Sequence, residues 1–281
     1  MPTDPTAPCT ISGPFYSDVV AWGTDVSVPI TFGAIDYQTS NFEQFQNIDG
    51  VCGMAGPANP QSVISQLATN NAIPAWMWSL CLQPGAVSNG TITLGGIDSR
   101  LHDGDVVYTP DVGGGQFYSM QLNGMKLGGQ QVYTDEPQVI IDSGTNILLL
   151  PDETFSSMKK LFLGMCSSQN QLHGICDVGS TETLFDGKCF DFTAAQIAAF
   201  PNITISVPSI DLVMTPKNYI LFEYGVNFKP GQYCLGISST GPQGLQIVGD
   251  TLLENYLTVF DQTNQKIGWA PVSNQCGNIQ A

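Results

Sequence analysis

Positively charged residues are scarce in this chain of 281 residues. It carries 8 Lys and Arg against 24 Asp and Glu, which gives a formal net charge of -16 at pH 7. Such an excess of negative charge repels phosphate backbones and anionic lipid headgroups, so nucleic acid is not an expected partner. Protonation of carboxylates would relieve this self-repulsion, and the composition therefore favours acidic surroundings.

Long apolar runs are also absent. No stretch approaches the roughly 20 apolar residues that cross a bilayer, so we expect no membrane span. Residues 1–9 contain neither the basic region nor the apolar region of a secretory signal. No targeting segment is therefore visible in this chain.

Several common catalytic and metal-binding patterns are missing. There is no CxxC pair, no Gly-x-Ser-x-Gly elbow, and no clustering of His and Cys of the kind that zinc requires. The two histidines, His102 and His173, stand in short polar or glycine-containing stretches and are interpreted as loop residues. We therefore expect no metal and no cofactor.

The residues that are present favour β structure. The chain has 30 Gly and 18 Pro, which separate many short runs of Val, Ile, Thr, Tyr and Phe. Its 8 Cys are an even number, as expected of disulfides in an oxidising compartment. Two glycosylation sequons, Asn89-Gly90-Thr91 and Asn202-Ile203-Thr204, agree with secretion.

Periodicity and turn signals predict the individual elements. Strands are expected at 26–32, 91–94, 139–141, 147–150, 256–260 and 266–270, and helices at 61–67, 152–164 and 193–199. Apolar alternation over 117–127, broken at Asn123-Gly124, predicts a hairpin with a type I′ turn at its tip. A boundary near Gly113–Gly115 is expected to divide the chain into 1–112 and 113–281.

A polar loop between two apolar runs is the strongest candidate for chemistry. Asp142, Ser143, Gly144 and Thr145 stand between residues 139–141 and 147–150. A carboxylate held between strands that enter the core is partly desolvated and needs hydrogen-bond donors, which the next three residues can supply. An ordinary surface turn does not need such apolar flanks. Gly144 would let the backbone approach the carboxylate.

This loop resembles the Asp-Ser/Thr-Gly-Ser/Thr loop of the C-terminal lobe in the pepsin-like aspartic protease family. Residues 247–249 are similar to the two apolar residues and Gly that thread against that loop, and Asp250 follows them. Further ordered similarities lie at 95–98, 212–220 and 256–271. The resemblance extends from about Ser12 onward and implies a mostly β, pepsin-like acid protease fold. It implies a complete C-terminal lobe at 113–281 and a partial N-terminal lobe at 1–112.

The resemblance also implies roles. Asp142 would be a catalytic carboxylate, Ser143 the hydroxyl that braces the two catalytic loops, and Thr145 the hydroxyl that supports the carboxylate. In the family two carboxylates share one proton and activate water, with peptides or proteins as substrates and no cofactor. It further implies secretion or an acidic lysosome- or vacuole-type compartment, and a monomeric full-length enzyme.

The second catalytic loop is expected to precede Met1. Val51, Cys52 and Gly53 resemble the apolar residues and Gly of the N-terminal lobe, whose Asp loop should lie far upstream. Gly249 lies 107 positions (249 minus 142) after Asp142, whereas only 52 residues precede Gly53. Asp142 is the only Asp followed by Ser or Thr and then Gly. This sequence is therefore expected to lack the first Asp loop and the flap that closes over substrate.

The cysteines are assigned in part. By resemblance, Cys189 and Cys234 form a disulfide of the C-terminal lobe, and Cys166 and Cys176 could close a small loop. Cys52 is interpreted as a buried thiol, because free Cys behaves as a small hydrophobe. Three others stay unassigned: Cys9, Cys81 and Cys276.

Three interpretations of function remain. The first is an aspartic endopeptidase whose second catalytic loop lies outside this sequence. The second is a non-catalytic pepsin-like protein that retains a peptide-binding cleft and works as a binding or inhibitory protein. The third is a homodimer that pairs two copies of Asp142, although the partial N-terminal lobe would obstruct it.

Overall fold

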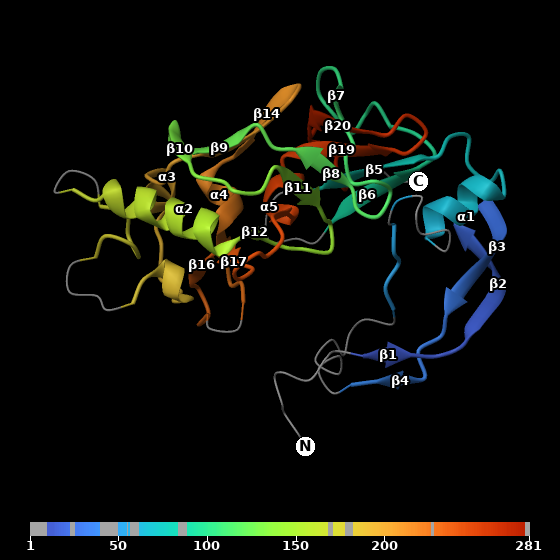
Figure 1. Cartoon of the computed structure of the whole chain (residues 1–281), viewed down its shortest axis with the longest axis horizontal. Coiled ribbons are helices and arrows are strands. Elements are labelled where there is room, and N and C mark those ends of the chain that lie inside the picture. The colour runs from blue at the N-terminus through green and yellow to red at the C-terminus, as the bar shows by residue number, and fades with distance from the viewer. Residues whose placement is uncertain are drawn as a thin grey trace.

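The computed structural model describes residues 10–22, 26–39, 50–54, 56, 62–83, 89–167, 171–177, 182–225 and 228–278. Short strands dominate this part of the chain (Figure 1). The strands are β1 (Ile11–Ser12), β2 (Phe15–Trp22), β3 (Val26–Gly33), β4 (Tyr37–Gln38), β5 (Met77–Leu82), β6 (Gly90–Leu94), β7 (Val107–Pro110), β8 (Ser119–Gln121), β9 (Gly124–Leu127), β10 (Gln130–Val132), β11 (Gln138–Ile141), β12 (Leu148–Leu150), β13 (Ile203–Val207), β14 (Ile210–Met214), β15 (Ile220–Phe222), β16 (Tyr233–Leu235), β17 (Ile237–Ser239), β18 (Ile247–Val248), β19 (Tyr256–Asp261) and β20 (Lys266–Pro271). The helices are α1 (Val63–Thr69), α2 (Asp152–Gly164), the 3₁₀ helix η2 (Leu184–Asp186), α3 (Ala194–Ala198), α4 (Pro216–Tyr219) and α5 (Asp250–Leu253).

One five-stranded sheet joins the early and late parts of the chain. Its order is β6-β5-β19-β20-β7, so the last two strands pair with strands from residues 77 to 110. Figure 1 shows these late strands, in red, beside the teal strands β5 and β6. The division at residues 112 and 113 remains a prediction, and this sheet is a direct link across it.

A second five-stranded sheet carries the candidate loop. Its order is β17-β12-β18-β11-β8, and the short strand β18 lies in the middle. β18 pairs with β11 in parallel and with β12 in antiparallel orientation. The chain therefore leaves β11, forms the loop, and returns as β12 on the other side of β18.

The hairpin expected at Asn123-Gly124 is wrong. β8 pairs with β11, whereas β9 pairs with β10 and β13, so β8 and β9 do not pair with each other. The tight turn comes after β9, where Gly128 (φ 55°) and Gly129 (φ 86°) connect Leu127 to its partner Gln130. Two successive residues at positive φ are typical of a type I′ hairpin turn, which glycine adopts without strain.

The predicted helices form close to their expected positions. α2 runs over 152–164 as expected and buries Thr154, Met158 and Phe162 on one face. α3 is capped by Thr193, whose hydroxyl accepts a hydrogen bond from the backbone N–H of Gln196. The first helix begins at Val63, and Gln61, from the predicted span, lies outside the described residues. No helix in the described ranges has the length and hydropathy to cross a membrane.

An aromatic cluster packs early and late segments into one core. The rings of Trp78 and Phe260 stack with centroids 4.1 Å apart, and Tyr118 packs against both. The Trp78 indole N–H donates to the Tyr118 hydroxyl at 3.0 Å, and that hydroxyl donates to the Met54 carbonyl at 2.9 Å. Burial raises the pKa of Tyr118 to about 12. Segments 40 and more residues apart thus share one apolar interior.

The strands β2 and β3 form a separate two-stranded hairpin at one side of the molecule (Figure 1). Ile30 of β3 is buried, and α1 contacts this strand. Phe15 and Val19 of β2, in contrast, are 66% and 62% exposed. An isolated hairpin of two strands is marginally stable in water, and Trp22, Val26 and Val28 of this one pack against the main core.

Candidate active site

Backbone pairing fixes the position of Asp142. Residue Asp142 directly follows β11, and its N–H donates to the carbonyl of Val248 at 3.0 Å, which extends the β11–β18 pairing by one residue. Val139 and Ile141 of the same strand are 0% and 3% exposed. The carboxylate is therefore held at the end of a strand that is anchored in the core.

The loop itself supplies the hydrogen-bond donors to this carboxylate. The Gly144 N–H donates to Asp142 Oδ1 at 2.9 Å, and the Thr145 hydroxyl donates to Oδ2 at 2.7 Å. A Cβ on Gly144 would lie 3.1 Å from Oδ1, so a side chain would crowd the carboxylate. Ser143 is exposed. Both oxygens of Asp142 are therefore oriented by neighbours two and three residues away.

Gly249 allows the return segment to cross the loop closely. A Cβ at this position would lie 1.8 Å from the carbonyl oxygen of Thr145 and 2.9 Å from that of Ile147. The next residue, Asp250, donates its N–H to the same Thr145 carbonyl at 2.8 Å. Only glycine fits this crossing, which locks the loop against β18.

A second carboxylate, Asp250, lies against the same loop. The Asn146 side-chain amide donates to Asp250 Oδ2 at 3.2 Å, whereas Oδ1 is buried and has no hydrogen-bond partner among the described residues. Burial raises the pKa of Asp250 to about 6; the Asn146 hydrogen bond opposes this shift and the charge of Asp142 adds to it. Sequence reasoning noted Asp250 only as the residue after the Ile-Val-Gly segment, which was the one available signal.

A cavity of about 680 Å³ opens beside this loop. Asn146 and Asp250 line one part of it. Apolar side chains from β6 and from the β15–β16 hairpin line other parts, including Ile92, Phe222 and Tyr233. Asp142 is not among the lining residues, so the cavity lies next to the loop and away from its carboxylate.

The remaining candidate residues lie in local contacts. His102 Nδ1 is 3.0 Å from the Gly104 carbonyl, and His173 Nδ1 is 3.2 Å from Asp177. Within the described ranges, no group of three or more His, Cys, Asp or Glu side chains could hold a metal ion. Neither histidine is hydrogen-bonded to the Asp142 loop.

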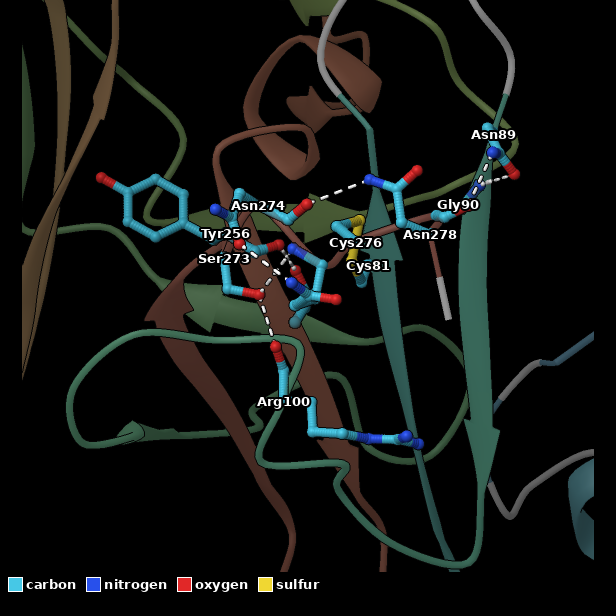
Figure 2. The surroundings of a disulfide bond; sticks show 12 residues. Cys81, Asn89, Gly90, Arg100, Tyr256, Ser273, Asn274, Cys276 and Asn278 are labelled. Carbon is cyan, nitrogen blue, oxygen red and sulfur yellow. Dashed lines mark hydrogen bonds between the residues drawn. A yellow bond between two sulfur atoms is a disulfide. The ribbon is translucent and has the colours of Figure 1, made fainter. Parts of the chain in front are cut away.

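The described residues contain three disulfides. Cys189–Cys234, the pair that the family resemblance implies, has Cα atoms 4.4 Å apart, and Cys166–Cys176 closes the small loop. The third, Cys81–Cys276, joins β5 to the C-terminal segment and was unassigned from the sequence (Figure 2). Cys52 is free and exposed, so the prediction of a buried thiol is wrong. Its neighbour Val51 is 89% exposed, which shows that this apolar segment does not enter the core.

A mostly β fold with a loop-held carboxylate opposite an apolar-apolar-Gly crossing is typical of aspartic proteases. The family model of eukaryotic aspartyl proteases matches residues 7–272. The chain belongs to this family.

Individual relatives share about a quarter of their aligned residues with this chain. The chain is 24% identical to Pepsin-2B of Gadus morhua over 91% of its own length and 74% of that protein. It is 24% identical to Cathepsin E of Aquarana catesbeiana, with 82% and 54% of the two chains covered. It is also 24% identical to Pepsin A of Sus scrofa, with 86% and 59% covered. The chain thus spans little more than half the length of the last two relatives.

Proposed function

We propose that this chain is part of an aspartic endopeptidase that hydrolyses peptide bonds in peptides or proteins, with Asp142 as one of its two catalytic carboxylates. The observation that carries the proposal is the hydrogen bonding of Asp142. Both of its oxygens accept hydrogen bonds, from the Gly144 N–H and the Thr145 hydroxyl. This arrangement keeps the carboxylate oriented in a loop that the return segment crosses closely at Gly249.

The chemistry needs a partner for Asp142. In a carboxylate dyad one group, ionised, takes a proton from water while the other, protonated, donates to the scissile carbonyl. One carboxyl group of such a dyad stays neutral while the other is charged, because two carboxylates that share a site repel each other. The sequence contains one Asp-Ser/Thr-Gly loop, and we propose that a second loop outside these 281 residues supplies the other carboxylate. Ser143, exposed beside Asp142, would brace the two loops.

The wider setting is part of the same proposal. The three disulfides and the net charge of -16 support secretion or an acidic lysosome- or vacuole-type compartment. We propose residues 113–281 as the C-terminal lobe and 1–112 as part of the N-terminal lobe, with β19 and β20 pairing across the division. The full-length enzyme is proposed to act as a monomer.

The test compares two forms of the protein in a peptide-hydrolysis assay at low pH. One is the chain of 281 residues, purified as monodisperse protein, and the other is a form extended by its upstream coding sequence to include a second Asp-Ser/Thr-Gly loop. We expect cleavage only by the extended form, and loss of that cleavage in Asp142→Asn. Asp105→Asn, which changes an exposed carboxylate outside the Asp142 loop, is the matched control and should retain activity.

Other outcomes separate the alternatives. Activity of the extended form that survives Asp142→Asn would overturn the role of Asp142. Cleavage by the chain alone that is lost in Asp142→Asn and on dilution would indicate a homodimeric dyad. Peptide binding without cleavage by either form would favour a non-catalytic binding or inhibitory protein.

A further inference from the structure

The two glycosylation sequons occupy different structural settings. Asn89 and Asn202 are both exposed, and each is followed two residues later by Thr. Oligosaccharide transfer requires the amide nitrogen Nδ2, which bonds to the first sugar. Transfer precedes folding, so a glycosylated chain can reach this fold only if the fold leaves space for a sugar on that asparagine's Nδ2. The contacts of the two amide groups therefore distinguish the sites.

The Asn89 amide is a structural contact. Its Nδ2 donates to the carbonyl of Gly277 at 2.7 Å, and its Oδ1 accepts from the N–H of Gly90 at 3.0 Å. Gly277 follows Cys276, whose disulfide to Cys81 holds the C-terminal segment against β5. Figure 2 shows Asn89 and Gly90 beside this segment. A sugar on Nδ2 would occupy the space between the sequon and the C-terminal segment.

The Asn202 amide has no such role. Asn202 is exposed and immediately precedes β13, and its side chain makes no hydrogen bond within the described ranges. Its backbone carbonyl is fixed, because it accepts from the N–H of Gly128 at 2.9 Å. Ile203 is fully buried, whereas Thr204 is partly exposed. Alternation along a strand places residues 202 and 204 on the same, outward side.

We propose that Asn202 carries an N-linked oligosaccharide and that Asn89, in the folded protein, does not. The donor is a lipid-pyrophosphate-linked oligosaccharide: a bond forms between Asn202 Nδ2 and C1 of the first N-acetylglucosamine, the bond from C1 to the pyrophosphate breaks, and Nδ2 loses a proton. The three disulfides support passage through the oxidising compartment in which this transfer occurs. β13 belongs to the sheet β10-β9-β13-β14, a different sheet from the one that holds the Asp142 loop.

To test this, the chain is expressed behind a secretion signal in eukaryotic cells. Enzymatic deglycosylation in ¹⁸O-water then converts each glycosylated Asn to ¹⁸O-labelled Asp. The labelled residues are located by mass spectrometry of unreduced peptides. Among the molecules that contain the Cys81–Cys276 disulfide, here called the disulfide-bonded pool, we expect label at residue 202 and none at residue 89. Because total cell protein can be mapped, the result does not depend on secretion. It is also independent of proteolytic activity.

Variants make the result decisive. Thr204→Ser keeps the sequon and should keep the glycan. Thr204→Val replaces threonine with a side chain of nearly the same shape but destroys the sequon, so this variant should lose the glycan. The loss of one glycan should increase the mobility of the protein on gels. Asn89→Gln should leave the mobility unchanged. Absence of label at residue 202 in the disulfide-bonded pool would overturn the site. Label at residue 89 in that pool would overturn the structural role of the Asn89 amide.

Discussion

Two carboxylates that contact one loop differ in how the fold satisfies them. Asp142 receives a hydrogen bond on each oxygen, from Gly144 and Thr145. Asp250 receives one, from Asn146 on Oδ2, and its buried Oδ1 has no partner among the described residues. A buried oxygen without a donor disfavours the charged form. The fold therefore favours the neutral form of Asp250, whose pKa is raised to about 6 chiefly by burial.

Asp250 should make stability depend on pH. Its pKa rises from the usual 3.8 to about 6 in the folded protein, chiefly through burial. Between these values the folded state binds more protons than the unfolded chain, so the free energy of unfolding falls as the pH rises from about 4 to about 6. We expect Asp250→Asn, which imitates the neutral acid, to be less sensitive than the parent over this range. Urea denaturation at several pH values measures the difference.

Asp105→Asn serves as the control for this measurement, because Asp105 is exposed and lies outside the loop. It should retain the parental slope of unfolding free energy against pH. A parental slope in Asp250→Asn as well would show that Asp250 titrates alike in the folded and unfolded states.

At the scale of elements, α2 shows how an apolar stripe becomes a stable helix. Phe162 is fully buried, and its ring lies against those of Phe185, Phe200 and Tyr219. The next residue, Leu163, is 44% exposed. A helix places consecutive residues on different faces, so two large apolar neighbours have unequal roles.

We expect Phe162→Ala to lower the free energy of unfolding by about 3–5 kcal/mol, because it removes buried contacts and leaves a cavity. Leu163→Ala is the matched control and should change the free energy of unfolding by less than about 1 kcal/mol, since Leu163 is 44% exposed. Denaturant unfolding followed by circular dichroism measures both. Equal losses in the two variants would contradict the packing of α2.

At the scale of the whole molecule, the C-terminal segment closes the fold. β19 and β20 complete a sheet begun by β5, β6 and β7, and the Cys81–Cys276 disulfide joins residues 195 positions apart. Cys166–Cys176, in contrast, closes a loop with a separation of 10. A cross-link restricts the unfolded chain more when it closes a longer loop.

Removing the long-range disulfide should therefore be the more damaging change. The chain-entropy relation gives a loss of about 5 kcal/mol for Cys81→Ala with Cys276→Ala, against about 3 kcal/mol for Cys166→Ala with Cys176→Ala. Urea unfolding of the two double variants beside the parent tests this order. A larger loss for the short loop would mean that the unfolded chain already keeps its C-terminal segment near β5.

Local sequence determined the features that depend on neighbouring residues. The apolar runs around Asp142 predicted a loop between buried strands, and the loop's own residues proved to be its hydrogen-bond donors. Helical spacing predicted α2 with its bounds, because the period of buried residues is a property of the helix itself.

Only the tertiary structure decided which strands pair and what each carboxylate meets. Alternation over 117–127 reports which side chains face inward, but it does not name the partner strand, so β9 paired with β13 in place of β8. The same limit hid the contact between β5 and β19 and the Cys81–Cys276 disulfide. The raised pKa of Asp250 depends chiefly on burial in the folded protein and in part on Asn146 and Asp142, which lie more than 100 positions away in the sequence. These features arise from long-range packing, which a pattern of neighbouring residues does not encode.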